Sequence, residues 1–161
     1  MIENLLLLSC RSPFLDDSKI YCPMGNLYLK SYLNQYAPNT KVTLGDDNYD
    51  LTKPNFEGFD AIGISIMTPQ REEAYKLVRA IKEYHPNTKV IIGGPHVKHY
   101  KDEVAQNTDF DYVIPLDGER PITSICLGKA NQRLISDVMT KEDIAKAPRP
   151  DRTSDNAKTV I

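Results

Sequence analysis

Five short apolar runs alternate with amphipathic segments along the chain, and this alternation is its main structural signal. The first run, residues 5–9, is a block of leucines ending in serine, which is typical of a strand buried on both faces. The others lie at residues 41–44, 61–66, 89–92 and 112–114. We expect each run to form a strand, with the weakest pattern at 41–44.

The segments between these runs predict helices, because apolar residues recur at helical spacing. The longest are expected near residues 24–36 and after residue 68, where Thr68 and Pro69 suit a cap and a first helical position. Shorter helices are expected at 102–106, 121–127 and 140–145. The expected buried faces consist of Leu29, Tyr32, Leu33 and Tyr36 in the first helix and Ala74, Leu77, Val78 and Ile81 in the second.

Strands that alternate with helices predict an α/β fold with a parallel sheet, because each right-handed crossover returns the chain to the same sheet. For five strands we expect a flavodoxin-like (Rossmann-like) sheet of order 2-1-3-4-5 with helices on both faces. Ligands bind such sheets beyond the carboxyl ends of the strands, near the switch point between strands 1 and 3. We expect residues 1–128 to form this domain and residues 129–161 to be a tail or linker toward a further domain.

Composition narrows the class of protein. The chain has 161 residues, 40% of them hydrophobic, and a net charge of -2, so nothing indicates binding to nucleic acid or to a membrane. The apolar start is too short for a membrane span and lacks the features of a signal peptide, so a cytoplasmic location is expected. Three widely spaced cysteines, Cys10, Cys22 and Cys126, favour reduced thiols over disulfides.

Three of the expected strands end in segments that should meet at one edge of the sheet: SCRS at 9–12, SIMT at 65–68 and GGPH at 93–96. None of them is a phosphate-binding glycine motif. Hydroxyl groups at Ser65 and Thr68 lie beside the bare backbone of Gly93 and Gly94, which would let a bulky ligand approach. The glycine pair has two interpretations at this stage, a tight turn or a ligand-contacting surface.

Four segments in order, CPMGNLYLKSYL, FDAIGISIMTPQ, KVIIGGPHV and DYVIPLDGERPI, resemble the N-terminal cobalamin (vitamin B12)-binding domain of cobalamin-dependent radical SAM proteins. The resemblance covers about residues 1–127 and implies cobalamin bound at the carboxyl edge of the sheet. It implies that the nucleotide tail reaches into the domain and that the corrin lies outside. It implies that Ser65 and Thr68 contact the tail, that Gly93 and Gly94 clear its path, and that Pro95 and His96 border the corrin. The other cofactor-binding residues that it implies are Met67 and, after the fifth strand, Gly118 and Glu119.

Two departures from related families sharpen the expectation. Cobalamin modules of the mutase and methionine-synthase type carry D-x-H-x-x-G after the first strand, whose histidine binds cobalt. Here the corresponding loop is CRSPFLD, without a histidine, and the G-E-G-E after strand five is matched by LDGE. We therefore expect a radical SAM type of module with no protein ligand to a metal.

The catalytic half of such proteins is a barrel whose CxxxCxxC motif binds a 4Fe-4S cluster and S-adenosylmethionine, and these 161 residues contain no such motif. We expect no catalytic residue in this chain. It would hold cobalamin for methyl transfer or rearrangement by a catalytic domain in cis or in trans. Two alternatives stay open: a non-catalytic flavodoxin-like signalling or interaction domain with an empty pocket, and a flavin-binding domain.

Three other features have a plain interpretation beside a functional one. His96 and His99 are expected to be solvated or lid residues more than a metal-binding pair. Cys10, at the switch point, is expected to be a small buried hydrophobe more than a reactive thiol. The aspartates of the loop 46–50 are expected to serve turn formation more than a magnesium site.

Overall fold

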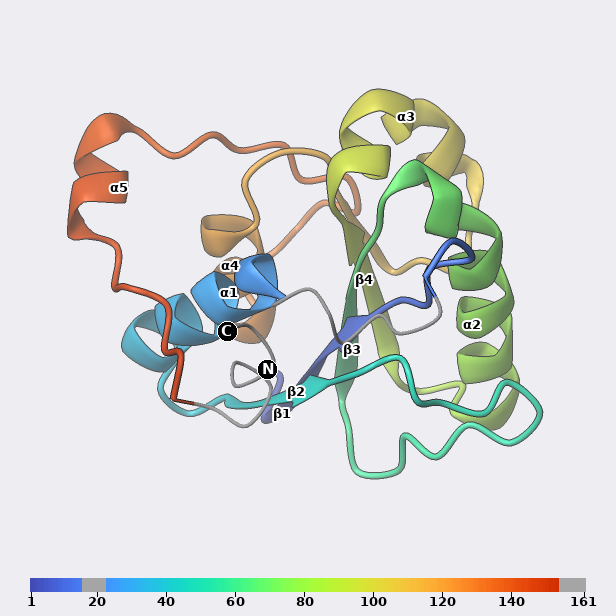
Figure 1. Ribbon diagram of the computed structural model, residues 1–161. Coiled ribbons are helices and arrows are strands. Elements are labelled where there is room, and N and C mark those ends of the chain that lie inside the picture. Colours follow the sequence, from blue (N-terminus) through green and yellow to red (C-terminus); the bar gives the residue numbers. More distant parts are fainter. Residues whose placement is uncertain (16–22, 154–161) are drawn as a thin grey trace.

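A five-stranded parallel sheet lies at the centre of the computed structural model, which describes residues 1–15 and 23–153. The strand order β2-β1-β3-β4-β5 confirms the expected topology (Figure 1). The strands are β1 Asn4–Ser9, β2 Lys41–Gly45, β3 Ala61–Ser65, β4 Lys89–Gly93 and β5 Tyr112–Ile114.

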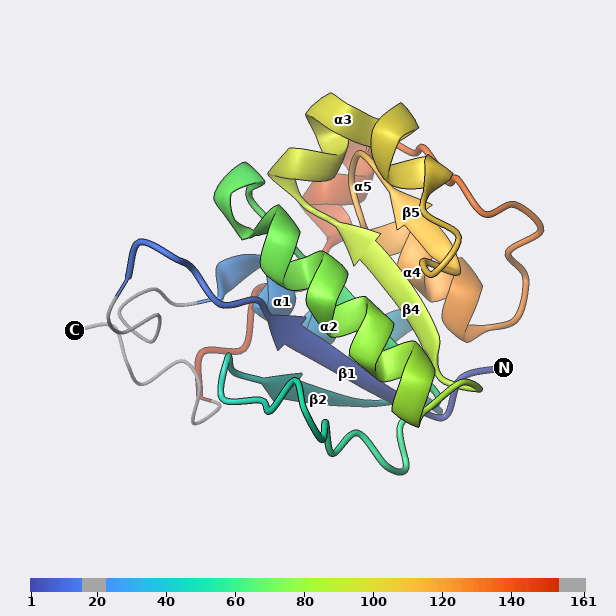
Figure 2. The ribbon, with the colours of Figure 1, turned by 90° about the vertical axis from the view of Figure 1, so that its right-hand side faces the viewer.

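Helices cover both faces of this sheet, as predicted. Figures 1 and 2 show α1 and α4 on one face and α2 and α3 on the other, while α5 stands apart on the side of α1 and α4. The helices are α1 Met24–Tyr36, α2 Arg71–Tyr84, α3 Pro95–Gln106, α4 Glu119–Cys126 and α5 Lys141–Lys146. None of the described helices has the length and apolar character needed to cross a membrane.

The leucines of β1 contribute to two separate hydrophobic cores, one on each face of the sheet. Leu6 and Leu8 belong to the core that contains Leu77 of α2, whereas Leu5 and Leu7 belong to the core under α1 and α4. All four leucines are at least 95% buried. Successive side chains of a strand point to opposite faces, so a strand covered on both sides needs continuous apolar residues.

Helix α2 begins differently from the expectation. A 3-10 turn, Thr68–Gln70, precedes it, and Met67 rather than Thr68 occupies the cap position. The amide N–H of Met67 donates to Gln70 Oε1 over 2.8 Å, and Gln70 Nε2 donates to the carbonyl of Cys10 over 2.7 Å. The buried Gln70 amide therefore joins the chain after β3 to the chain after β1.

Helix α3 is longer than predicted, because it begins at Pro95 instead of near residue 102. Proline suits the first helical position, and Gly94 before it has φ +100°, which ends the strand abruptly. The helix bends at Tyr100, whose φ and ψ are not helical. His96 lies inside the first turn and is fully buried, so the expectation of a solvated or lid residue at His96 is wrong.

Residues 133–149, which we call the strap, pack back onto the domain. The strap runs beside β5, where the N–H of Val113 donates to the carbonyl of Arg133 and the N–H of Ile135 donates to the carbonyl of Val113. Its helix α5 confirms the predicted one, with the Thr140 hydroxyl as N-terminal cap. That residues 129–161 lead to another domain stays a prediction, and residues 154–161 lie outside the described part, as does Cys22.

Candidate functional site

A cavity of about 260 Å³ lies between the sheet and helices α1 and α4. Its walls include Leu7, Ile91 and Ile114 of the sheet and Ile122 of α4, so its interior is mainly apolar. We call it the inner cavity. The predicted cofactor residues on its lining are Ser65, Gly93, Gly94, Gly118 and Glu119.

Glycines keep part of this cavity open. A Cβ atom added at Gly63, in the middle of β3, would lie 2.8 Å from Cδ2 of Leu7 in the cavity wall. One added at Gly93 would lie 3.3 Å from the carbonyl oxygen of Ile114. Glycine weakens a strand interior unless close approach requires it. The absence of side chains at these two positions therefore preserves space on the sheet side of the cavity.

Gly94 has a different reason to be glycine. Its φ of +100° disfavours any other residue, and an added Cβ would lie 2.7 Å from the backbone nitrogen and oxygen of Ile66. The same Cβ would lie 2.7 Å from Oγ of Ser65. The turn interpretation therefore holds for Gly94, while both Gly93 and Gly94 line the inner cavity.

A second cavity, the edge cavity of about 210 Å³, lies at the carboxyl ends of β1 and β3. Strand register places Ser65 directly beside Ser9 of β1 on one side and Gly93 of β4 on the other. Asn26 Nδ2 donates to Ser9 Oγ over 3.5 Å. Gly25, Asn26 and Ser65 line both cavities, so the two meet at this polar junction.

Two predicted residues, Met67 and Pro95, line the edge cavity, whereas Thr68 and His96 line neither. The hydroxyl of Thr68 lies 3.2 Å from Nδ1 of His96, and the His96 ring stacks on Tyr100 at 4.9 Å between centroids. Nε2 of His96 has no hydrogen-bond partner among the described residues. Burial lowers the pKa of His96; nearby Glu103 opposes the shift and Arg71 adds to it. His96 is therefore held neutral behind the site.

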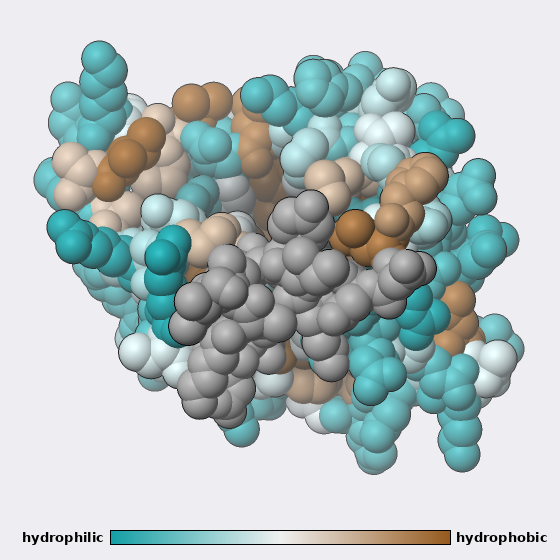
Figure 3. Space-filling model, viewed as in Figure 1, coloured by the Kyte–Doolittle hydropathy of each residue, from teal (hydrophilic) through white to brown (hydrophobic). Residues whose placement is uncertain are grey.

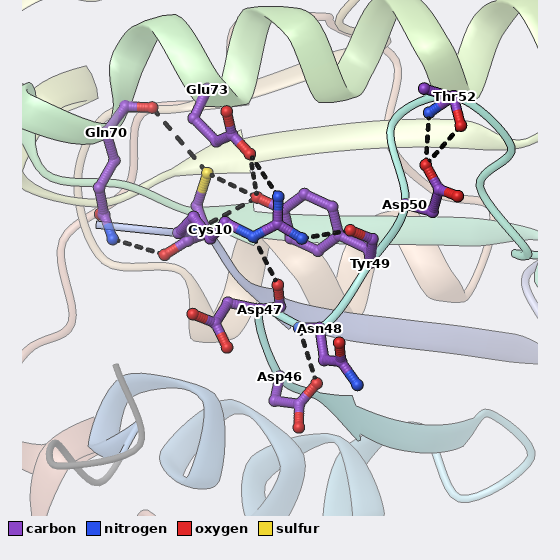
Figure 4. Close-up of polar contacts among 10 residues, drawn as sticks. Cys10, Asp46, Asp47, Asn48, Tyr49, Asp50, Thr52, Gln70 and Glu73 are labelled. Carbon is purple, nitrogen blue, oxygen red and sulfur yellow. Dashed lines mark hydrogen bonds and ion pairs between the residues drawn. The ribbon is translucent and has the colours of Figure 1, made fainter. Parts of the chain in front are cut away.

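The loop after β1 is fixed by a polar cluster, drawn in Figure 4. Arg11 donates to the carbonyls of Asp47 and Tyr49 and pairs with Glu73 of α2 at 3.5 Å. The Tyr49 hydroxyl lies 3.5 Å from Sγ of Cys10 and also accepts from the N–H of Arg11. Arg11 thus ties together two loops and a helix.

Cys10 and the acidic loop follow their plain interpretations. Burial raises the pKa of the Cys10 thiol to about 11, and Cys10 is a free, buried cysteine. The N–H groups of Asn48 and Thr52 donate to the carboxylates of Asp46 and Asp50, which is turn chemistry (Figure 4). Within residues 1–15 and 23–153 no group of three or more His, Cys, Asp or Glu side chains could hold a metal ion.

A third cavity, the outer cavity of about 380 Å³, lies between the strap and the inner cavity. It shares Tyr28, Asp117 and Glu119 with the inner cavity, and its other side consists of strap residues such as Met139 and Ile144. Figure 3 shows a hollow in the upper middle of this view, with hydrophobic residues along it and on the α5 side, and further hydrophobic surface on the opposite side. The inner cavity therefore adjoins the edge cavity on one side and the outer cavity on the other.

Sequence reasoning missed the contribution of α1. Gly25, Asn26, Tyr28 and Leu29, all in its first two turns, line the inner cavity. The signal was present in CPMGNLY, where a glycine inside a helical segment is unfavourable for the helix and so indicates a further role. What the sequence did not reveal is that the first turns of this helix line the same cavity as the sheet glycine at position 63.

The lining chemistry fits one type of ligand. Among the described residues, no Lys, Arg or His lines the inner cavity, and its charged residues are Asp117 and Glu119, so an uncharged group suits it best. At about 260 Å³ it lies just below the ~300–1,000 Å³ typical of pockets for whole small ligands. A ring-sized part of a larger ligand fits there. The edge cavity faces the first turn of α1, whose partial positive charge favours an anionic group.

Comparisons with known proteins agree with this geometry. A family model described as the B12 binding domain matches residues 23–125. Among solved structures, the fold is similar to that of the cobalamin-dependent S-adenosylmethionine radical enzyme OxsB with aqua-cobalamin bound, with a TM-score of 0.61 and 15% sequence identity. The match covers 81% of this chain and 19% of that chain. No curated protein matches.

Proposed function

The chain belongs to the B12-binding domain family, and from this premise we propose that it is the cobalamin-holding module of a radical SAM enzyme. In this role it binds the cofactor at the carboxyl edge of the sheet. A catalytic domain, in cis or in trans, uses it for methyl transfer or rearrangement. The observation that carries the proposal is the inner cavity, whose glycines and apolar walls leave ring-sized space beside a polar junction.

The inner cavity, the polar junction and the edge cavity suit successive parts of cobalamin. The ring at the end of the nucleotide tail is flat and uncharged, which suits the inner cavity. The phosphate of the tail suits the junction of Ser65 and Asn26 at the first turn of α1. The corrin is too large for any of these cavities and would rest outside them, next to Met67 and Pro95 at the edge.

Cobalamin supplies the organometallic chemistry when bound, and this chain supplies binding and orientation. Gly93 leaves space for the tail, while Ser65 and Asn26 are placed to hydrogen-bond it. Thr68 and His96 would act indirectly, because their contact holds the first turn of α3, which contains Pro95. The 4Fe-4S cluster and S-adenosylmethionine would belong to the catalytic domain.

A cytoplasmic location is part of the same proposal. Cys10 and Cys126 are free, buried cysteines, in keeping with a reducing compartment. Fractionation of the native host cells would test it: recovery of the protein in the cytoplasmic fraction is expected, and recovery in an extracellular fraction would contradict it.

A cavity-blocking variant tests cobalamin binding directly. Gly25 lines the inner and edge cavities, and a Cβ added there has no atom of the described residues within 4 Å, so the Gly25→Leu side chain should occupy the site. We expect the unchanged protein to retain hydroxocobalamin on gel filtration and to alter its visible spectrum. Gly25→Leu should lose both properties while keeping its circular dichroism.

The control is Gln35→Leu, which adds the same side chain to an exposed position of the same helix. It should bind cobalamin as the unchanged protein does. If the unchanged protein neither retains cobalamin nor changes its spectrum, the proposal fails and the non-catalytic interaction domain becomes the better hypothesis. Retention by Gly25→Leu would instead show that the cofactor binds elsewhere.

A further inference from the structure

The loop Leu116–Glu119, which follows β5 and ends with the first residue of α4, forms part of the wall of two cavities. All four residues line the inner cavity, and Asp117 and Glu119 also line the outer one. The position of this short loop therefore affects the shape of both. In the structure the loop is held mainly from its outer side, by the strap.

Backbone contacts join the loop to the strap. The N–H of Asp117 donates to the carbonyl of Asp137 over 3.1 Å, and the N–H of Met139 donates to Asp117 Oδ2 over 2.8 Å. Asp117 is thus held through both its main chain and its side chain. Both contacts depend on the strap staying in place next to α4.

One side chain, Arg120, fastens the strap to α4. Its guanidinium forms a fork on Asp137, with Nε donating to Oδ2 over 2.8 Å and Nη2 donating to Oδ1. It also donates to Asp143 Oδ2 over 2.9 Å and to the carbonyl of Val138 over 2.8 Å. Asp143 in turn completes the capping box of α5 with Thr140. Only arginine offers a planar fork with enough donors for all these acceptors.

We propose that Arg120 is a positioning residue for cobalamin: it fastens the strap to α4 and thereby holds the loop Leu116–Glu119 as the common wall of the inner and outer cavities. This inference rests on the proposed function. Arg120 lines neither cavity, so it acts on the ligand through the loop. Removal of the guanidinium should loosen the wall and speed the release of cobalamin.

The chain provides a matched control in Arg133, at the other end of the strap. Arg133 donates to the carbonyls of Ala105, Asn107 and Phe110, so it fastens the same segment with a similar number of bonds. Its contacts lie beside α3, and Arg133 lines none of the three cavities. A purely structural role of the strap would make the two arginines equivalent for cobalamin binding.

The test compares Arg120→Met and Arg133→Met in the full chain. The dissociation constant for hydroxocobalamin is measured from the visible spectrum, its release rate by competition, and the stability of each variant by urea unfolding. We expect both variants to be less stable. Arg120→Met alone should bind about tenfold more weakly, mainly through faster release. Arg120→Lys, which keeps the charge but not the fork, should fall between it and the unchanged protein.

Each outcome bears on the proposal. Equal affinity of Arg120→Met and the unchanged protein would overturn it, as would equal weakening by Arg133→Met. Absence of cobalamin binding by the unchanged protein would overturn the proposed function itself. That result differs from a failure of the Arg120 proposal, in which the unchanged protein binds and Arg120→Met binds equally well. If Arg120→Met does not fold, Asp137→Asn tests the same fork with a smaller change, and unaltered affinity in that variant would also overturn the proposal.

Discussion

The turn after β4 allows the most quantitative prediction, for Gly94→Ala. Gly94 has φ +100° and ψ -179°, a combination that is essentially restricted to glycine and costs other residues about 1–3 kcal/mol. The added Cβ would also lie 2.7 Å from both backbone polar atoms of Ile66. These atoms cannot move freely, because the Ile66 N–H donates to the Gly93 carbonyl and the Ile66 carbonyl accepts from the His96 N–H.

Overpacking of this kind adds about 1–3 kcal/mol, so the expected loss in the free energy of unfolding is about 2–6 kcal/mol. Urea unfolding followed by circular dichroism measures it. With a slope of about 2 kcal/mol per M, a loss of 4 kcal/mol lowers the midpoint by about 2 M. The same experiment on Gly25→Ala provides the contrast, because open space in a helix should give a gain of about 0.5–1 kcal/mol.

A loss below about 1 kcal/mol in Gly94→Ala would refute this reasoning, since both the backbone cost and the clash would then be relieved by small shifts. Such a result would favour the other interpretation of the Gly93–Gly94 pair, in which Gly94 leaves space for a ligand. Cobalamin affinity does not decide this point, because a variant with a distorted turn loses binding in either case.

Two further predictions concern buried groups. The pKa of His96 is lowered in the folded state, so its contribution to stability is complete above the unfolded pKa of 6.5 and decreases as the pH falls below that value toward the folded pKa. His96→Phe should therefore reduce the fall in the free energy of unfolding between pH 7.5 and 5.5, and identical pH profiles would contradict this. In a Cys22→Ser background, Cys10 and Cys126, each with a pKa of about 11, should react with a thiol reagent at pH 8 at least about a hundredfold more slowly in the folded than in the unfolded protein. Equal rates would show that the two thiols are accessible.

The sheet and most of its helices could be predicted from sequence because their signals are local. Continuous apolar runs predict buried parallel strands, and helical spacing of Ala74, Leu77, Val78 and Ile81 predicts a helix with one buried face, as observed. The start of α3 could not be predicted in this way. It depends on the turn at Gly94, whose geometry is set by contact with Ile66, far away in the sequence.

The candidate site was predicted in location and only partly in composition. Ser65, Gly93 and Gly118 do line the inner cavity, because the carboxyl ends of parallel strands meet at one edge. Thr68 and His96 instead contact each other at the first turn of α3, away from the cavity lining. Their side-chain directions follow from the 3-10 turn and the first helical turn, which the strand pattern does not specify.

The sequence by itself determined the class of fold and the order of the strands, and it indicated the edge of the sheet at which the candidate site lies, since hydrophobic periodicity and chain connectivity suffice for these. Only the tertiary structure decided that Gly93 and Gly94 both line a cavity and that Gly94 also makes a turn in which other residues are disfavoured. It also decided that the strap forms part of a cavity wall, fastened by Arg120. These facts depend on contacts between segments that are distant in the sequence, and no local pattern encodes such contacts.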